Sequence, residues 1–415
     1  MMRFRPVIAL IVLIAAGGGA AQSVDFSGDV SLQTRWFPES PEFSGQRWGS
    51  SGLVVEPTLY WDIAEQASFT FTPLYRYDSA DSRRTHADLR EAYLLMYGDW
   101  GDSFWELRVG FDRVFWGVVE LHNLVDVVNQ FDLIEHPREE AKLGQPMAYL
   151  TVSGGWGTAE WLVLPYHRKR TFAGSGGRFR GSLPLVDDAL YESGAEERHV
   201  DLAARYSNSI GPLDFGLSAF AGTNREPFFV PALPPGLIPD PATPFIPYYE
   251  QIRHFGLDAQ LTTGDWLYKL EAIRRSGARN LAGREEDYHA FILGLERNVY
   301  AVFGSTVDMV LLAEWHDDSR GSLATNAWAN DLFVGVAVTF NDVQSTELTA
   351  GILGDLSRSY RALNLGLRRR LSDNWSMRLE AIAQLKVDPL DLTYDVRRAS
   401  FLGLDFTYSY RWFRC

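Results

Sequence analysis

Residues 402–411 read LGLDFTYSYR, with an apolar or aromatic side chain at every second position. Side chains on a β-strand point alternately to opposite faces, so this segment has one apolar face and one polar face. The same alternation recurs near 24–36, 66–77, 265–275 and 304–316. Helical periodicity is hard to find after the first twenty or so residues. The sequence therefore predicts an all-β protein.

The composition narrows the class of protein. The chain has 415 residues, of which 46% are hydrophobic and 22% charged, and its formal net charge is −14. Enough apolar residues are present for a folded chain rather than a disordered one. The negative charge argues against nucleic acid as a partner, because a phosphate-binding surface needs an excess of basic residues. The one cysteine, Cys415, excludes an intramolecular disulfide and a cysteine-based zinc site.

The N-terminal segment has the pattern of an export signal. Arg3 and Arg5 precede an apolar run over 7–16, and small residues follow as far as Ala21. This apolar run is too short to span a bilayer, which needs about 20 residues. We expect residues 1–21 to be a signal peptide and residues 22–415 to form a single domain.

The connections between the expected strands alternate in length. Segmentation by alternation predicts about 18 strands, with roughly 16 to 20 possible. Long connections such as 37–50, 112–145 and 167–197 alternate with tight turns. Short turns at one rim and long loops at the other are typical of outer-membrane barrels, and a closed barrel leaves no backbone group unpaired in lipid. The predicted fold is a transmembrane antiparallel up-and-down β-barrel with both termini periplasmic. The alternative is a water-soluble β-sandwich or several small β domains, but tyrosine and tryptophan at the strand ends favour the membrane barrel.

Three short motifs lie around the connection 112–145. They read GFDRVFWG at 110–117, DVVNQFD at 126–132 and KLGQPM at 142–147. With these motifs the chain resembles the porin-like barrels of Gram-negative outer membranes, in particular a largely uncharacterised group with a WG…DxxNxxD third loop. The resemblance covers the whole of 22–415. It implies an outer-membrane location, lipids and lipopolysaccharide as partners, and a homo-oligomer, since porins are often trimers.

Loop 112–145 is the third long connection and the main candidate for a functional site. In porins the corresponding loop folds into the pore, so we expect this loop to narrow the lumen. It contains seven acidic residues and three basic ones, and an acidic constriction favours cations. The alternative is that these charges pair with one another and hold the shape of the loop. The predicted constriction comprises Asp112, Arg113, Glu120, Asp126, Asn129, Asp132, Glu135 and Arg138.

A basic array on the last three strands is the second candidate. Alternation points Arg368, Arg370, Arg378 and Arg411 into the lumen, where they would form a basic wall opposite the acidic loop. Such a wall would orient dipolar solutes. The alternative is pairing across strands with Glu380 and Asp405, or contact with lipopolysaccharide phosphates.

No enzymatic pattern stands out, and we expect no catalytic residue, no metal site and no cofactor. Three histidines, His254, His289 and His316, are expected to face inward, but none has an adjacent serine or a pair of carboxylates. His316 is followed by Asp317 and Asp318 at a strand end. Their imidazole and carboxylates could bind a divalent cation, but we interpret this run as a solvated strand end. The predicted function is a porin-like channel for small hydrophilic solutes. The alternatives are a barrel that serves an export or scaffolding machine and, less favoured, an outer-membrane hydrolase.

Overall fold

The computed structural model describes residues 23–137, 141–233, 238–240 and 242–414. The expected signal peptide 1–21 and Arg138 of the predicted constriction lie outside the described residues. No helix among the described residues combines the length and the apolar character that a membrane span requires.

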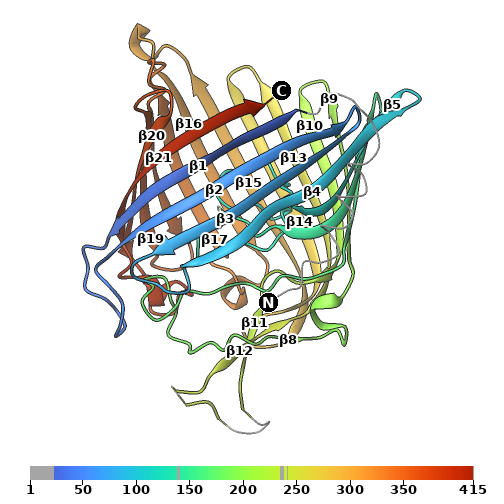
Figure 1. The fold of residues 1–415 in the computed structure, drawn as a ribbon. Coiled ribbons are helices and arrows are strands. Elements are labelled where there is room, and N and C mark those ends of the chain that lie inside the picture. Colours follow the sequence, from blue (N-terminus) through green and yellow to red (C-terminus); the bar gives the residue numbers. More distant parts are fainter. Residues whose placement is uncertain (1–22, 138–140, 234–237, 241, 415) are drawn as a thin grey trace.

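Eighteen antiparallel strands form one closed sheet. The strands are strongly tilted within the barrel wall, as Figure 1 shows. The ring closes where the first strand pairs with the last, from Val24 opposite Arg414 to Trp36 opposite Leu402. The prediction of an all-β closed antiparallel barrel is therefore confirmed. The strands of the barrel are β1 (Val24–Trp36), β2 (Gly49–Ala64), β3 (Ala67–Asp78), β4 (His86–Trp100), β5 (Ser103–Asp112), β6 (Gln145–Gly154), β7 (Gly157–Leu164), β9 (Asp201–Ile210), β10 (Leu213–Thr223), β13 (Gln251–Thr263), β14 (Trp266–Arg279), β15 (Glu285–Val299), β16 (Asp308–Asp318), β17 (Asn330–Thr339), β18 (Glu347–Asp355), β19 (Arg361–Arg370), β20 (Trp375–Lys386) and β21 (Phe401–Arg414).

The two rims of the barrel differ in the length of their connections. Tight turns such as those between β6 and β7 and between β9 and β10 lie at the rim where the chain ends, and the long loops lie at the opposite rim (Figure 1). Two of these long loops add a small three-stranded sheet, formed by β8 (Leu190–Tyr191), β11 (Phe228–Pro231) and β12 (Phe245–Tyr249). The sequence did not predict this sheet, because its strands are too short to show a period of two.

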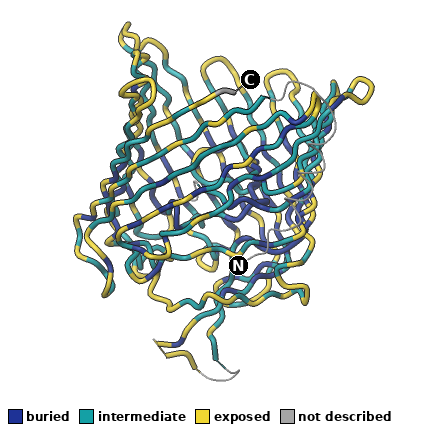
Figure 2. The backbone as a smooth tube through the Cα atoms, in the orientation of Figure 1, coloured by how far each residue is buried: buried dark blue, intermediate teal, exposed yellow. Residues whose placement is uncertain are grey.

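The faces of the strands divide as the alternation predicts. Buried and exposed stretches alternate along the barrel strands in Figure 2. On β3, Phe71, Tyr75 and Tyr77 are exposed, whereas Thr72 and Arg76 between them are buried. Exposed leucine and valine side chains continue the apolar outer band around the ring. An apolar outer face and a polar inner face are what a barrel in lipid requires.

The interior is not uniformly polar. A cluster of buried apolar residues lines the inner face from β6 to β15 and includes Leu162, Leu164, Phe220, Ile252 and Ile273. These side chains cannot be recognised from alternation alone, because they occupy positions that the pattern assigns to the polar face. Their partners come from loop 112–145.

Candidate functional site

Loop 112–145 packs against the inner wall through its apolar residues. Val114, Trp116, Val125, Val127 and Val128 are all buried in the same cluster as the inward side chains of β6 to β15. Trp116 also donates its indole N–H to Glu160 on β7. Burying such side chains removes apolar surface from water and stabilises the loop in this position.

Two buried carboxylates on the barrel wall hold the loop backbone. Glu271 on β14 accepts the N–H groups of Val118 and Val125 at 2.8 and 3.3 Å. Glu314 on β16 accepts the N–H groups of Glu120 and Leu121 at 2.6 and 3.3 Å. Hydrogen bonds to a charged acceptor are stronger than neutral ones, so the wall fixes this stretch of the loop.

The glycine and asparagine of the loop motif have clear structural roles. Gly117 has φ of 141°, and a Cβ there would lie 2.0 Å from the side-chain amide of Asn123 and 2.8 Å from Glu271 Oε1. Only glycine fits this close approach. Asn129 ties the two ends of the loop together, because its amide donates to the carbonyl oxygens of Asp112 and Leu143 and its Oδ1 accepts the N–H of Val114.

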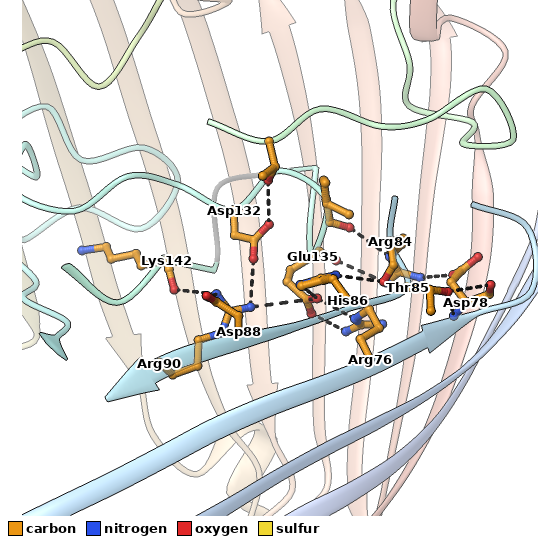
Figure 3. Close-up of polar contacts among 12 residues, drawn as sticks. Arg76, Asp78, Arg84, Thr85, His86, Asp88, Arg90, Asp132, Glu135 and Lys142 are labelled. Atoms are coloured by element: carbon orange, nitrogen blue, oxygen red, sulfur yellow. Dashed lines mark hydrogen bonds and ion pairs between the residues drawn. The ribbon is translucent and has the colours of Figure 1, made fainter. Parts of the chain in front are cut away.

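The second half of the loop meets a cluster of arginines from the opposite side of the barrel (Figure 3). Arg76 on β3 binds both carboxylate oxygens of Glu135, and Arg90 on β4 lies 2.9 Å from Asp132. Arg84 donates to the backbone carbonyl oxygen of Ile134. Burial alone would raise the pKa of the Glu135 carboxyl, but the nearby guanidinium groups outweigh this effect and lower the pKa below its ordinary value.

Beyond Glu135 the loop reaches the last strands of the barrel. His136 Nε2 lies 3.4 Å from Glu380 Oε2 on β20. A pocket of about 220 Å³ opens beside this contact. Its walls include the guanidinium groups of Arg35, Arg76 and Arg378 and the carboxylates of Glu135, Glu380 and Asp405.

Among the residues of this pocket, Arg35 is a cation without a matching carboxylate. Its guanidinium lies 5.3 Å from the ring centre of Phe401 and 5.8 Å from that of Phe179. It makes one long hydrogen bond, of 3.5 Å, to the backbone oxygen of Glu135. No ion pair within 4 Å joins Arg35 to a carboxylate in the described part of the chain, but the carboxylates of Glu380 and Asp405 line the same pocket and act on its charge from a longer distance.

The structure pairs most acidic residues of the predicted constriction with basic ones. Asp112 lies 3.2 Å from Arg108, Glu120 lies 2.9 Å from Lys269, and Asp126 forms an ion pair with Lys142. Burial lowers the pKa of the Lys142 ammonium, and the charge of Asp126 opposes that shift. Arg113 lies 2.7 Å from Glu91 on β4. Most of these partners belong to the barrel wall rather than to the loop itself.

The four arginines of the predicted basic wall lie at different places. Arg368 on β19 and Arg378 on β20 are directly opposite one another in the register. Arg370 donates to the carbonyl oxygen of Val343 at the short-turn rim. Arg411 lies 2.7 Å from Asp25 on β1. Of the four, Arg378 is the one that lines the pocket beside the loop.

Three residues of the arginine cluster have the ligand types of a metal site. His86, Asp132 and Glu135 place one ligand atom each within 4.8 Å of one another. Arg76 and Arg90 already bind the two carboxylates (Figure 3). A cation at this position would be repelled by these guanidinium groups, so the geometry favours an ion-pair cluster over a metal site.

The histidines do not support hydrolysis. His254 is buried near Ser218, but its Nδ1 accepts a hydrogen bond from Arg275 Nε at 3.4 Å. This nitrogen is therefore occupied by the guanidinium and is not available to take a proton from a serine. The expectation that His289 faces inward is wrong. It is exposed on the outer face of β15, and its neighbours Tyr288 and Ala290 are buried inside.

Sequence reasoning missed the residues that receive the loop. Arg35, Arg76, Arg90, Glu271 and Glu314 come from five strands, and no local motif connects them. One signal was available, because each is a charged residue at an inward position of an alternating strand. The sequence does not show which of these inward charges meet the loop.

Comparison with known proteins supports the fold. No protein-family model and no curated protein matches the chain. Among solved structures, Pseudomonas aeruginosa OccK3 (OpdO) is 10% identical and has a TM-score of 0.52, with 95% of this chain and 96% of that chain covered. A mutant of a porin from Rh. blastica is 9% identical with a TM-score of 0.44, with 93% and 100% covered. The similarity to OccK3 is one of fold, that of a porin-like barrel.

Proposed function

We propose that the protein is an outer-membrane channel through which small hydrophilic solutes diffuse past loop 112–145. The observation that carries this proposal is the attachment of the loop to both sides of the barrel. Glu271 and Glu314 bind it on β14 and β16, and Arg76 and Glu380 bind it on β3 and β20. A barrel of eighteen strands is wide enough to hold water, and a loop across it sets the narrowest point.

The charges beside the loop favour hydrophilic solutes over apolar ones. Carboxylates and guanidinium groups both line the pocket of about 220 Å³ between the loop and β20. Apolar solutes gain no favourable contact with these charged groups. Small polar or charged solutes, in contrast, replace part of their hydration shell with contacts to them. On this proposal Asp112, Arg113, Glu120 and the other predicted loop residues set the shape and charge of the constriction, and Arg378 faces them.

On this proposal the outer face of the barrel contacts the lipids of the outer membrane. Its apolar band meets lipid, and lipopolysaccharide surrounds the rim with the long loops. Because porins are often trimers, we also propose that copies of this chain associate through part of the same band.

Liposome swelling tests the proposal. Vesicles that contain the purified protein should swell in isotonic solutions of small neutral sugars and amino acids and resist larger sugars. Replacing Glu271 by Leu removes the acceptor of several loop N–H groups and should raise the size limit.

Glu285→Gln is the matched control, because this carboxylate is exposed at the start of β15. It should leave the swelling rates unchanged. Vesicles that do not swell with any solute would contradict the proposed function and favour a barrel that works only within an export or scaffolding machine.

A further inference from the structure

The missing side chain of Gly403 leaves a gap in the inner wall of the barrel. In the register, Gly403 of β21 lies between Arg35 of β1 and Glu380 of β20. Neighbouring strands lie about 4.8 Å apart, so the backbones of Arg35 and Glu380 are about 10 Å apart across the glycine. All three residues line the pocket of about 220 Å³ beside loop 112–145. The gap is therefore a part of this pocket with a charged side chain on either side.

Asp405 lies on the same face of β21, two residues further along the strand. In the register it lies between Gln33 and Arg378, and it lines the same pocket. Gln33 donates its amide to Asp405 Oδ2 at 3.4 Å. In the described part of the chain no lysine or arginine nitrogen lies within 4 Å of the Asp405 carboxylate, and the charges of Arg35 and Arg378 act on it from a longer distance. The carboxylate can therefore accept a cationic group from a solute.

Arg35 is the matching cation on the other side of the gap. The rings of Phe401 and Phe179 lie 5.3 and 5.8 Å from its guanidinium, and aromatic faces attract a guanidinium without neutralising its charge. Because Arg35 is opposite Gly403, Arg35 and Asp405 are diagonal neighbours on adjacent strands, with backbones about 7–8 Å apart. A cation and an anion therefore face one gap at a spacing that a small solute can bridge.

The other charged groups of the pocket have oppositely charged partners in the protein. Arg76 binds both carboxylate oxygens of Glu135. Arg378 lies 3.6 Å from Glu380. A solute that bound these groups would have to compete with the protein partners they already have. It therefore gains most from the one guanidinium and the one carboxylate that have no such partner in contact.

We propose that the gap at Gly403 binds the zwitterion of a small α-amino acid, with its carboxylate on Arg35 and its ammonium group on Asp405. A guanidinium binds a carboxylate through two parallel N–H donors, and an ammonium group donates to a carboxylate. The pocket volume of about 220 Å³ equals that of about seven water molecules in the liquid, which limits the site to small solutes. The inference rests on the proposed channel function, because the lumen is the route by which a solute reaches the gap.

Ligand-observed NMR by saturation transfer tests the site on the full-length barrel in detergent micelles. The probes are L-alanine, propionate and ethylammonium, because they have a similar size and differ in charge. L-Alanine should bind. Propionate and ethylammonium should each bind at least about tenfold more weakly, because each lacks one of the two charged hydrogen-bonding groups. The measurement needs no transport, so its outcome is independent of liposome swelling.

Three variants locate the site. Arg35→Gln and Asp405→Asn should each weaken L-alanine binding by about tenfold or more. Asp405→Asn should also remove the preference for L-alanine over propionate. Gly403→Leu should block the gap and leave both charges in place. A Cβ at Gly403 would meet nothing closer than the ring of Phe401 at 3.4 Å, so the strand can accept the added side chain.

Arg253→Gln and Asp287→Asn are the matched controls, because they make the same chemical changes at exposed positions of β13 and β15 and should leave L-alanine binding unchanged. Heat-dependent gel migration shows whether each variant has folded into the barrel. Propionate binding as tight as that of L-alanine, or L-alanine binding that the three site variants leave unchanged, would overturn the proposal. An absence of L-alanine binding in the unmodified protein would overturn it too, even if vesicles swell in L-alanine. Binding without swelling would support the site and contradict the channel.

Discussion

Replacing Glu135 by Gln should loosen loop 112–145 and shift the charge of the pore. The Glu135 and Arg76 side chains are 7% and 4% exposed, and Arg90 lies 3.9 Å from the same carboxylate. Removing one member of a buried ion pair costs about 3–5 kcal/mol, because the other charge stays buried without a partner. We expect most of this cost to appear as weaker attachment of the loop, since the strands on either side keep their own hydrogen bonds.

The same substitution removes one negative charge from the lumen, so the net charge there rises by one unit. For an ion about 8 Å away in water, a unit charge contributes about 0.5 kcal/mol, and screening at 0.1 M salt roughly halves this value. This interaction energy has opposite signs for anions and cations. The ratio of anion to cation permeability should therefore rise by about two- to fivefold.

Reversal potentials across a planar bilayer under a salt gradient measure this ratio. Glu65→Gln is the matched control, because Glu65 is exposed in the turn between β2 and β3 and should leave the potential unchanged. A reversal potential that is the same for Glu135→Gln and the unmodified protein would refute the assignment of Glu135 to the pore lining.

Three further predictions follow from the loop. The pKa of the Glu135 carboxyl is lowered from its ordinary value of 4.5, so its contribution to loop attachment is fully present above that ordinary value and is lost as the pH falls through the lowered pKa. Single-channel current should become noisier over that acidic range, and Glu135→Gln should remove this pH dependence. Replacing Asp126 and Asp132 by Asn removes the carboxylate that pairs with Lys142 and one of the carboxylates that pair with Arg90. Reversal potentials should then show a reduced preference for cations, whereas unchanged potentials would exclude a charge filter in the loop. Trp116→Ala removes a buried side chain and should destabilise the loop by about 3–5 kcal/mol, which faster cleavage within 112–145 by added protease would reveal.

The barrel could be predicted because its physical constraints are local. A strand with one face in lipid and one in water alternates residue by residue, as in 402–411, and an antiparallel barrel alternates short and long connections. Both patterns are visible in a single sequence. The outward Phe71 and Tyr75 and the inward Arg76 follow this pattern.

The site could be predicted only in part, because its contacts are not local. Loop 112–145 and its motif were recognisable, but Glu271 and Arg76 bind the loop from strands far away in the sequence. The inward apolar residues of β6 to β15, such as Leu164, are visible only when their partners in the loop are known.

The unitary conductance of the purified protein in planar bilayers tests the central claim most directly. It should be compared with that of a variant in which residues 118–136 are replaced by a short glycine–serine linker. We predict a stable ohmic conductance for the unmodified protein and a larger one for the variant, because the loop crosses the lumen. Equal conductances, or a closed barrel in both cases, would contradict a loop-narrowed channel.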